Sequence, residues 1–223
     1  MKTEREFIID ILKQLGELDY IEPESIPNID LYMDQVTTFM DSHLANSKRY
    51  EDDKILTKTM INNYTKNDLL PPPEKKKYSR DHMLMLTLIY YYKNLLSISD
   101  IQTLLEPLKE NYFGKDGERN LSDVYERIFD LCKGERNSYV REILKKYDVA
   151  CDAFPDEADG DPEEQDYLRK FSFVSLLGFD IYLKKVVMES IVDEMREEQE
   201  KKKEKAEKEA KDKKDSKEKK DPK

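Results

Sequence analysis

The sequence is poor in the residues that build catalytic and metal sites. It has two histidines, His43 and His82, two cysteines, Cys132 and Cys151, and no tryptophan among its 223 residues. The cysteines are too far apart for a C-x-x-C pair, and neither histidine belongs to an H-E-x-x-H motif. The six glycines are scattered and form no phosphate-binding loop. We therefore expect no enzymatic activity, no metal site and no cofactor.

Long apolar runs are missing as well. The N-terminal stretch mixes acidic residues into its apolar run and shows no small-residue cleavage site, unlike a secretory signal. The most apolar stretch, residues 171–188, contains Asp180, Lys184 and Lys185, and charged side chains are costly in lipid. The sequence predicts a cytoplasmic protein without a membrane partner, in which both cysteines stay reduced.

Basic charge is scarce overall but concentrated in one segment. The net charge is −10, and residues 1–53 and 94–193 carry −8 and −9. Residues 54–93 carry +5, and residues 194–223 carry +2. A basic segment within an acidic body is typical of a localised anion-binding face. A chance local excess of lysine is the alternative interpretation.

Helical periodicity runs through almost the whole chain, so we expect an all-α fold. The apolar spacing predicts helices near 3–16, 31–44, 58–67, 80–94 and 98–111, two further amphipathic helices between 121 and 147, and a long helix near 163–196. Asp30, Thr57, Ser79 and Ser97 are the expected N-caps. Prolines at 71–73 forbid helix and predict an extended segment.

The domain organisation follows from these elements. We assign residues 1–29 to an N-terminal helix and connector, and 30–113 to a helix-turn-helix with a wing and supporting helices. Residues 118–196 form a C-terminal helical region, and 197–223 form a charged tail, expected to be disordered because it lacks apolar positions. The final helix is apolar almost all round near its centre, which predicts a homodimer interface. A monomer with this helix in its core is the alternative.

The most informative segment is residues 55–78, ILTKTMINNYTKNDLLPPPEKKKY. It predicts a short helix that ends at Leu69 and Leu70, an extended strand bounded by prolines, a run of lysines and then a new helix. A winged helix-turn-helix needs these parts, and its short helix enters the major groove of DNA.

At these residues the sequence resembles the MerR-type winged helix-turn-helix family. The pattern T-I-R-Y-Y-E-x-x-G-L-L-x-P, followed by Y-R-x-Y, is matched by Ile61, Tyr64, Leu69, Leu70, Pro72 and Tyr78. Residues 97–105 also resemble that family, so the resemblance covers about 55–108. The segments LTKTMINNYTK and KKYSRDHMLML are more similar to a family of uncharacterised, distantly MerR-like bacterial proteins. This second resemblance covers about residues 30–150. The pattern's arginine falls here on Asn62, its first tyrosine on Asn63 and its glycine on Asp68, and its wing Y-R on Lys75 and Lys76.

Candidate DNA-binding residues follow from the chemistry of DNA. Asparagine is suited to bidentate reading of adenine, and a helix N-terminus with hydroxyl groups favours phosphate. The short helix supplies Thr57, Lys58, Thr59, Asn62, Asn63 and Lys66, and the lysine run and next helix supply Lys75, Lys76, Lys77 and Arg80 as phosphate contacts. Under the alternative reading, the lysines form a solvated turn and the asparagines are ordinary polar positions of a helix surface or its end.

These features predict a sequence-specific DNA-binding transcriptional regulator, with double-stranded DNA as its partner. The alternative is a protein–protein adaptor that keeps a helix-turn-helix scaffold without binding DNA. The sequence does not identify an effector ligand.

Overall fold

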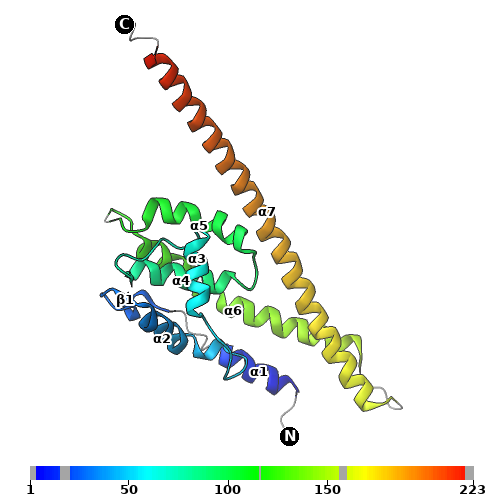
Figure 1. The fold of residues 1–223 in the computed structure, drawn as a ribbon. Coiled ribbons are helices and arrows are strands. Elements are labelled where there is room, and N and C mark those ends of the chain that lie inside the picture. The colour runs from blue at the N-terminus through cyan, green and yellow to red at the C-terminus, as the bar shows by residue number, and fades with distance from the viewer. Residues whose placement is uncertain (1–3, 16–20, 116, 156–159, 219–223) are drawn as a thin grey trace.

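The computed structural model of the chain describes residues 4–15, 21–115, 117–155 and 160–218, and over these ranges the fold is helical with one small sheet (Figure 1). The expected all-α class is confirmed. The elements, in chain order, are α1 (Glu4–Leu15), η1 (Pro23–Ser25), β1 (Leu31–Tyr32), α2 (Met33–His43), η2 (Ala45–Ser47), α3 (Lys58–Lys66), β2 (Lys77–Tyr78), α4 (Arg80–Tyr92), α5 (Ile98–Tyr112), α6 (Leu121–Ala153) and α7 (Pro162–Glu218).

Helix α4 lies at the centre of the globular part. Every residue from His82 to Tyr90 is buried, whereas a helix that packs on one side only buries a stripe of about 100°. Because α4 is buried all round, other elements must cover it from several directions. The hydrophobic core around it includes side chains from both strands and from α2, α3, α5 and α6.

The sheet joins two segments that are distant in the sequence. Strands β1 and β2 pair antiparallel, with Leu31 opposite Tyr78, and both side chains are buried. The sequence predicted helix from residue 31 with Asp30 as its N-cap, and this was wrong. Helix α2 begins after the strand, and the backbone N–H of its N-cap Tyr32 donates to Oε1 of Gln35 at 2.8 Å. Pairing with β2 holds residues 31–32 extended, which local periodicity does not reveal.

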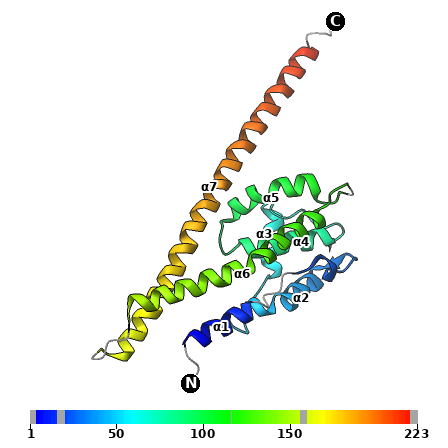
Figure 2. The same cartoon turned by 180° about the vertical axis from the view of Figure 1, so that it is seen from behind.

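Helices α6 and α7 extend from the globular part, pack against each other where the end of α6 meets the first part of α7, and diverge toward the globular part (Figure 2). Two separate helices were expected between 121 and 147, but α6 is one helix of 33 residues. Gly134 lies inside it, and nothing lies within 4 Å of the place where its Cβ would be. A glycine lowers helix stability by only about 1 kcal/mol relative to alanine, so it need not interrupt a helix.

Helix α7 continues far beyond its expected end. It runs to Glu218, so the disorder expected for 197–223 is wrong for 197–218, while 219–223 lie outside the described residues. Contacts with α5, which α7 crosses, are part of the reason why the helix continues past residue 196. Val192 is buried in the common core, and Arg196 pairs with Asp100 at 2.6 Å. One turn further, Nε2 of Gln199 donates to the carbonyl of Thr103 at 2.9 Å.

A buried histidine closes the first turn of α4. The backbone N–H of Ser79 donates to Nδ1 of His82 at 3.0 Å, so His82 takes the place that glutamate or glutamine usually takes in a capping box. The ring packs edge-on against Tyr78 and Phe113. Burial lowers the pKa of His82 below its ordinary value of 6.5, although the carbonyls of Pro72 and Pro71 oppose this effect.

We predict that His82 makes the fold sensitive to acid. The unfolded chain binds a proton at the ordinary histidine pKa of 6.5, whereas the folded chain binds it only at lower pH. The contribution of neutral His82 to the free energy of unfolding is therefore complete above pH 6.5, and it is lost as the pH falls through the lowered pKa of the folded state. The measurement is urea unfolding between pH 7.5 and 5, and His82→Gln, which keeps a capping acceptor, should lose this component of the pH slope. The partly exposed His43→Gln is the control, and an unchanged slope in His82→Gln contradicts the prediction.

Candidate nucleic-acid interface

Helix α3 is a short, well-capped helix, as the sequence predicted. The hydroxyl of Thr57 accepts a hydrogen bond from the backbone N–H of Met60 at 3.2 Å, which confirms Thr57 as the N-cap. Ile61 and Tyr64 are buried and fix the inner side of the helix. The ring of Tyr64 belongs to the core, and this burial raises the pKa of its hydroxyl.

Two lysines hold the ends of α3. Nζ of Lys93, from the end of α4, donates to the carbonyl of Ile55 at 2.7 Å, just before the helix begins. Burial lowers the pKa of Lys93, and its ammonium lies 4.6 Å from the ring centroid of Tyr90. At the other end, Nζ of Lys109 from α5 donates to the carbonyl of Asp68 at 3.0 Å. The helix is therefore held from both ends by side chains of two other helices.

These two lysines were not among the residues selected from the sequence. Lys93 directly follows an apolar run of tyrosines at the end of α4, and a lysine in that place is a weak sign of a partly buried ammonium group. Lys109 shows no such sign, because its partner Asp68 is 41 residues away in the chain. Both are positioning residues for α3.

The outer side of α3 gathers most of the predicted contact residues. The structure leaves five of them exposed on this side, namely Lys58, Thr59, Asn62, Asn63 and Lys66. Half-buried Thr57 lies at its start. We call these six residues the α3 face. One acidic side chain borders it, because Lys58 forms an ion pair with Asp34 of α2.

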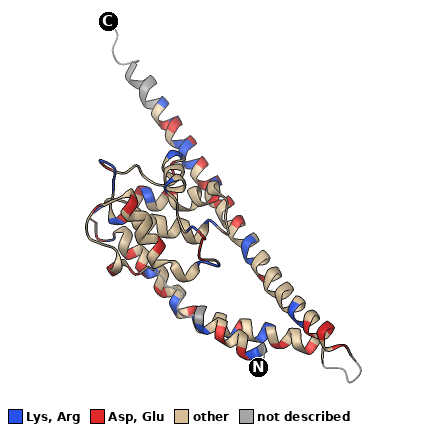
Figure 3. Cartoon of the chain, turned by 60° about the horizontal axis from the view of Figure 1, so that its bottom comes forward, with Lys and Arg blue, Asp and Glu red and all other residues tan. Residues whose placement is uncertain are grey.

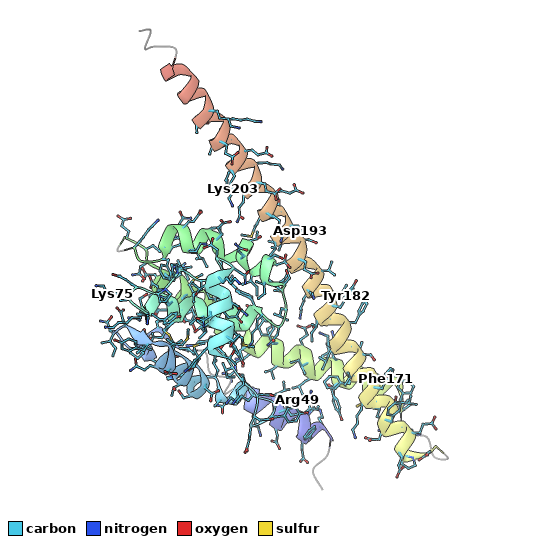
Figure 4. All side chains as sticks on the ribbon, in the orientation of Figure 1. Arg49, Lys75, Phe171, Tyr182, Asp193 and Lys203 are labelled. Atoms are coloured by element: carbon cyan, nitrogen blue, oxygen red, sulfur yellow. The ribbon has the colours of Figure 1, made fainter. Side chains whose placement is uncertain are left out.

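The lysine run forms a tight turn over residues 74–77, which we call the lysine turn. The backbone N–H of Lys77 donates to the carbonyl of Glu74 at 2.9 Å, and the two residues between them, Lys75 and Lys76, have φ of 49° and 66°. Positive φ at both central positions is the property of a type I′ turn, which strongly prefers Asn-Gly. Lys75 and Lys76 are exposed, and Figure 4 shows Lys75 at the edge of the globular part farthest from α7.

The α3 face and the lysine turn lie on either side of the start of α2. Lys58 contacts Asp34, and Nζ of Lys77 lies 5.5 Å from the ring centroid of Tyr32, two residues earlier in the chain. Lys58 of α3 and Lys77 of β2 therefore both lie against the start of α2.

Arg80 does not join this group. Its guanidinium is half-buried, and Nη2 donates to the carbonyl of Pro23 at 2.8 Å and lies 3.4 Å from Oγ of Ser122. It fastens the segment before α2 to the starts of α4 and α6, so we leave it out of the candidate interface.

Within the ranges that the structure describes, no cluster of three or more histidine, cysteine, aspartate or glutamate side chains could hold a metal ion. No helix in those ranges has both the length and the apolar character that crossing a membrane requires.

Part of the chain is similar to a known protein family. Residues 21–128 match the model of a family described as "Domain of unknown function (DUF1836)". The matched region begins before β1 and ends within α6, so it includes the α3 face, the lysine turn and both positioning lysines. No curated protein matches the chain, and no solved structure matches it.

We predict that the lysine turn stores strain that a better turn sequence would release. Residues other than glycine lose roughly 1–2 kcal/mol in the left-handed region, and Asn-Gly is the preferred type I′ pair. Lys75→Asn/Lys76→Gly should therefore raise the free energy of unfolding by about 1 kcal/mol, because the added freedom of glycine in the unfolded chain offsets part of the gain. Urea unfolding measures it. Lys77→Asn, outside the two strained positions, should give no gain, and a destabilised double variant contradicts the prediction.

Proposed function

We propose that this protein is a sequence-specific DNA-binding regulator of transcription, with the α3 face as its base-reading surface and the lysine turn as a phosphate contact. The observation that carries the proposal is the lysine turn itself. Lysines occupy the two positions where the backbone favours asparagine and glycine, and both are exposed. Strain of this kind persists mainly where function requires the side chains, and phosphate is the partner that two adjacent lysines suit best.

The dimensions of α3 support binding in the major groove. An α-helix with its side chains is about 10–12 Å in diameter, and the major groove is about 12 Å wide, so a short helix such as α3 can enter it. The exposed amide of Asn62 is suited to pairing with adenine, and Lys66 lies one turn further along the same side. The start of the helix, with Thr57 and Thr59, offers backbone N–H groups and hydroxyls to a phosphate.

The arrangement also supports a winged helix-turn-helix of the MerR type as the origin of this surface. The turn at residues 74–77 and strand β2 correspond in sequence to the wing of that family, and β2 pairs here with β1 from before α2. The glycine of the MerR pattern falls on Asp68, whose φ of 56° lies in the left-handed region that glycine favours. Lys109 binds both the carbonyl and the carboxylate of this residue, which compensates for the strained backbone.

A protein–protein adaptor remains the second candidate, because of the apolar side chains exposed on α7. Several, among them Phe171, Phe179 and Tyr182, are more than half exposed. An adaptor needs no strained lysine turn, so substitution there distinguishes the two functions.

We predict a steep dependence of DNA affinity on salt. Each phosphate contact contributes a slope of roughly −0.9 to the plot of log affinity against log salt concentration. Lys75→Asn/Lys76→Gly should weaken binding to all duplexes alike and reduce the slope by about 2, if each lysine contacts one phosphate. Fluorescence anisotropy with a labelled duplex measures both quantities. Lys201→Asn/Lys202→Asn on α7 is the charge-matched control, and equal effects of the two double variants contradict the proposal.

We predict a different effect for the asparagines of the α3 face. Asn62→Ala or Asn63→Ala should lower affinity for the preferred sequence by about 1–3 kcal/mol and relax the preference at one base pair, because a base contact is lost. Binding to unrelated duplexes should hardly change. Asn94→Ala removes an exposed amide elsewhere and is the control. Unchanged sequence preference in both face variants means that α3 does not read bases.

A further inference from the structure

The stretch of α7 that runs beside α6 has two different sides. On one side, Phe173 is buried and its ring meets Tyr147 of α6 edge-on, at 5.4 Å between centroids. Asp180 and Lys146 form an ion pair at 2.9 Å across the same contact. Lys184, one turn further, lies 3.6 Å from the carboxylate of Glu142.

The other side of this stretch is apolar and exposed. Successive helix residues turn by about 100°, so residues two positions from Phe173 and Asp180 point away from α6. This side carries Phe171, Val174, Gly178, Phe179, Tyr182 and Val186, which we call the outer face of α7. Phe171, Phe179 and Tyr182 are 58%, 63% and 59% exposed. Figure 4 shows Phe171 and Tyr182 along the arm of α7 below its crossing with α5.

Charge is almost absent from the outer face. Between Phe171 and Val187 the only charged residues are Asp180, Lys184 and Lys185, and the first two are directed to α6 by ion pairs. Lys185, seven residues after Gly178, is the charged residue of the outer face and pairs with Glu189 at 3.6 Å. Figure 3 shows α7 mostly tan over this stretch and densely coloured toward its C-terminal end. Depletion of charge distinguishes the buried centre of a stable interface from ordinary protein surface.

We propose that the outer face of α7 binds a second copy of this chain, in an antiparallel crossing centred on Gly178. A whole aromatic side chain has a surface of about 150–250 Å². On this basis the outer face and its apolar neighbours on α7 together expose an area on the order of 800 Å². A standard interface buries about 800 Å² on each partner, so the area suffices for a stable dimer. Interfaces this apolar are typical of permanent partners, and two-fold pairs of identical chains are the commonest permanent assembly.

The position of Gly178 supports the antiparallel arrangement. It lies midway between Phe171 and Val186, the two ends of the outer face, and it is exposed. Apart from the helix's own backbone, no described residue comes within 4 Å of the place where its Cβ would be, so packing among these residues does not require glycine here. A two-fold axis at this point brings the backbones of the two helices closest where there is no side chain. It also places Phe171 of each copy beside Val186 of the other. The inference concerns assembly and does not rest on DNA binding.

The experiment measures the mass of the full chain by light scattering over a dilution series. Wild type should be a dimer, and Phe179→Glu should raise the dissociation constant by about 100-fold or more, because each copy would bring an unpaired carboxylate into the interface. The matched control is Leu131→Glu on α6, which changes a 69% exposed leucine outside the outer face and should remain dimeric. A monomeric wild type, or a Phe179→Glu variant as dimeric as the control, overturns the proposal.

A cross-linking measurement keeps the test decisive if Phe179→Glu fails to fold. The two native cysteines, Cys132 and Cys151, are only partly buried and are first changed to serine. In this background Gly178→Cys should form an intermolecular disulfide on mild oxidation, because the two residues meet at the axis. Leu131→Cys should not. Absence of the Gly178→Cys cross-link, or equal cross-linking by both variants, overturns the antiparallel crossing.

Discussion

The burial of α4 on all sides is the constraint on which the rest of the structure depends. A helix with apolar residues from Met83 to Tyr90 cannot lie on a surface, so the sheet and the neighbouring helices must enclose it. Helix α3 packs Ile61 and Tyr64 into the same core, which leaves its polar residues on the outside. The candidate DNA-reading face is therefore a consequence of how the core is closed.

The lysines of this chain serve two different physical purposes. Lys93 and Lys109 give their ammonium groups to backbone carbonyls and fix the two ends of α3. Lys75 and Lys76 remain exposed on a strained turn, where their charge is free to meet an anion. A helix held at both ends and an exposed basic turn are two parts that a DNA-binding module needs, since base contacts specify the sequence and phosphate contacts fix the position.

The sequence predicts those parts of the fold that local chemistry decides. Capping residues such as Thr57 and Ser97 gave the starts of α3 and α5 correctly. Contacts between distant segments could not be predicted from the sequence. Strands of two residues have no periodicity, and the pairing of Leu31 with Tyr78 joins residues that are far apart in the chain. For the same reason Arg80, assigned to phosphate, lies instead against the segment before α2. The candidate face was predictable from helical spacing, whereas the lysines that position it were not.

The proposals of DNA recognition by α3 and of self-association through α7 are independent of each other. The most direct measurement of DNA recognition is selection of bound duplexes from a random pool by the purified full chain, followed by sequencing. We expect a defined motif to be enriched, and to occur as two inverted half-sites if the chain is also a dimer through α7. Recovery of the starting pool without enrichment, at a salt concentration where the protein still binds duplex DNA, would contradict sequence-specific recognition by α3.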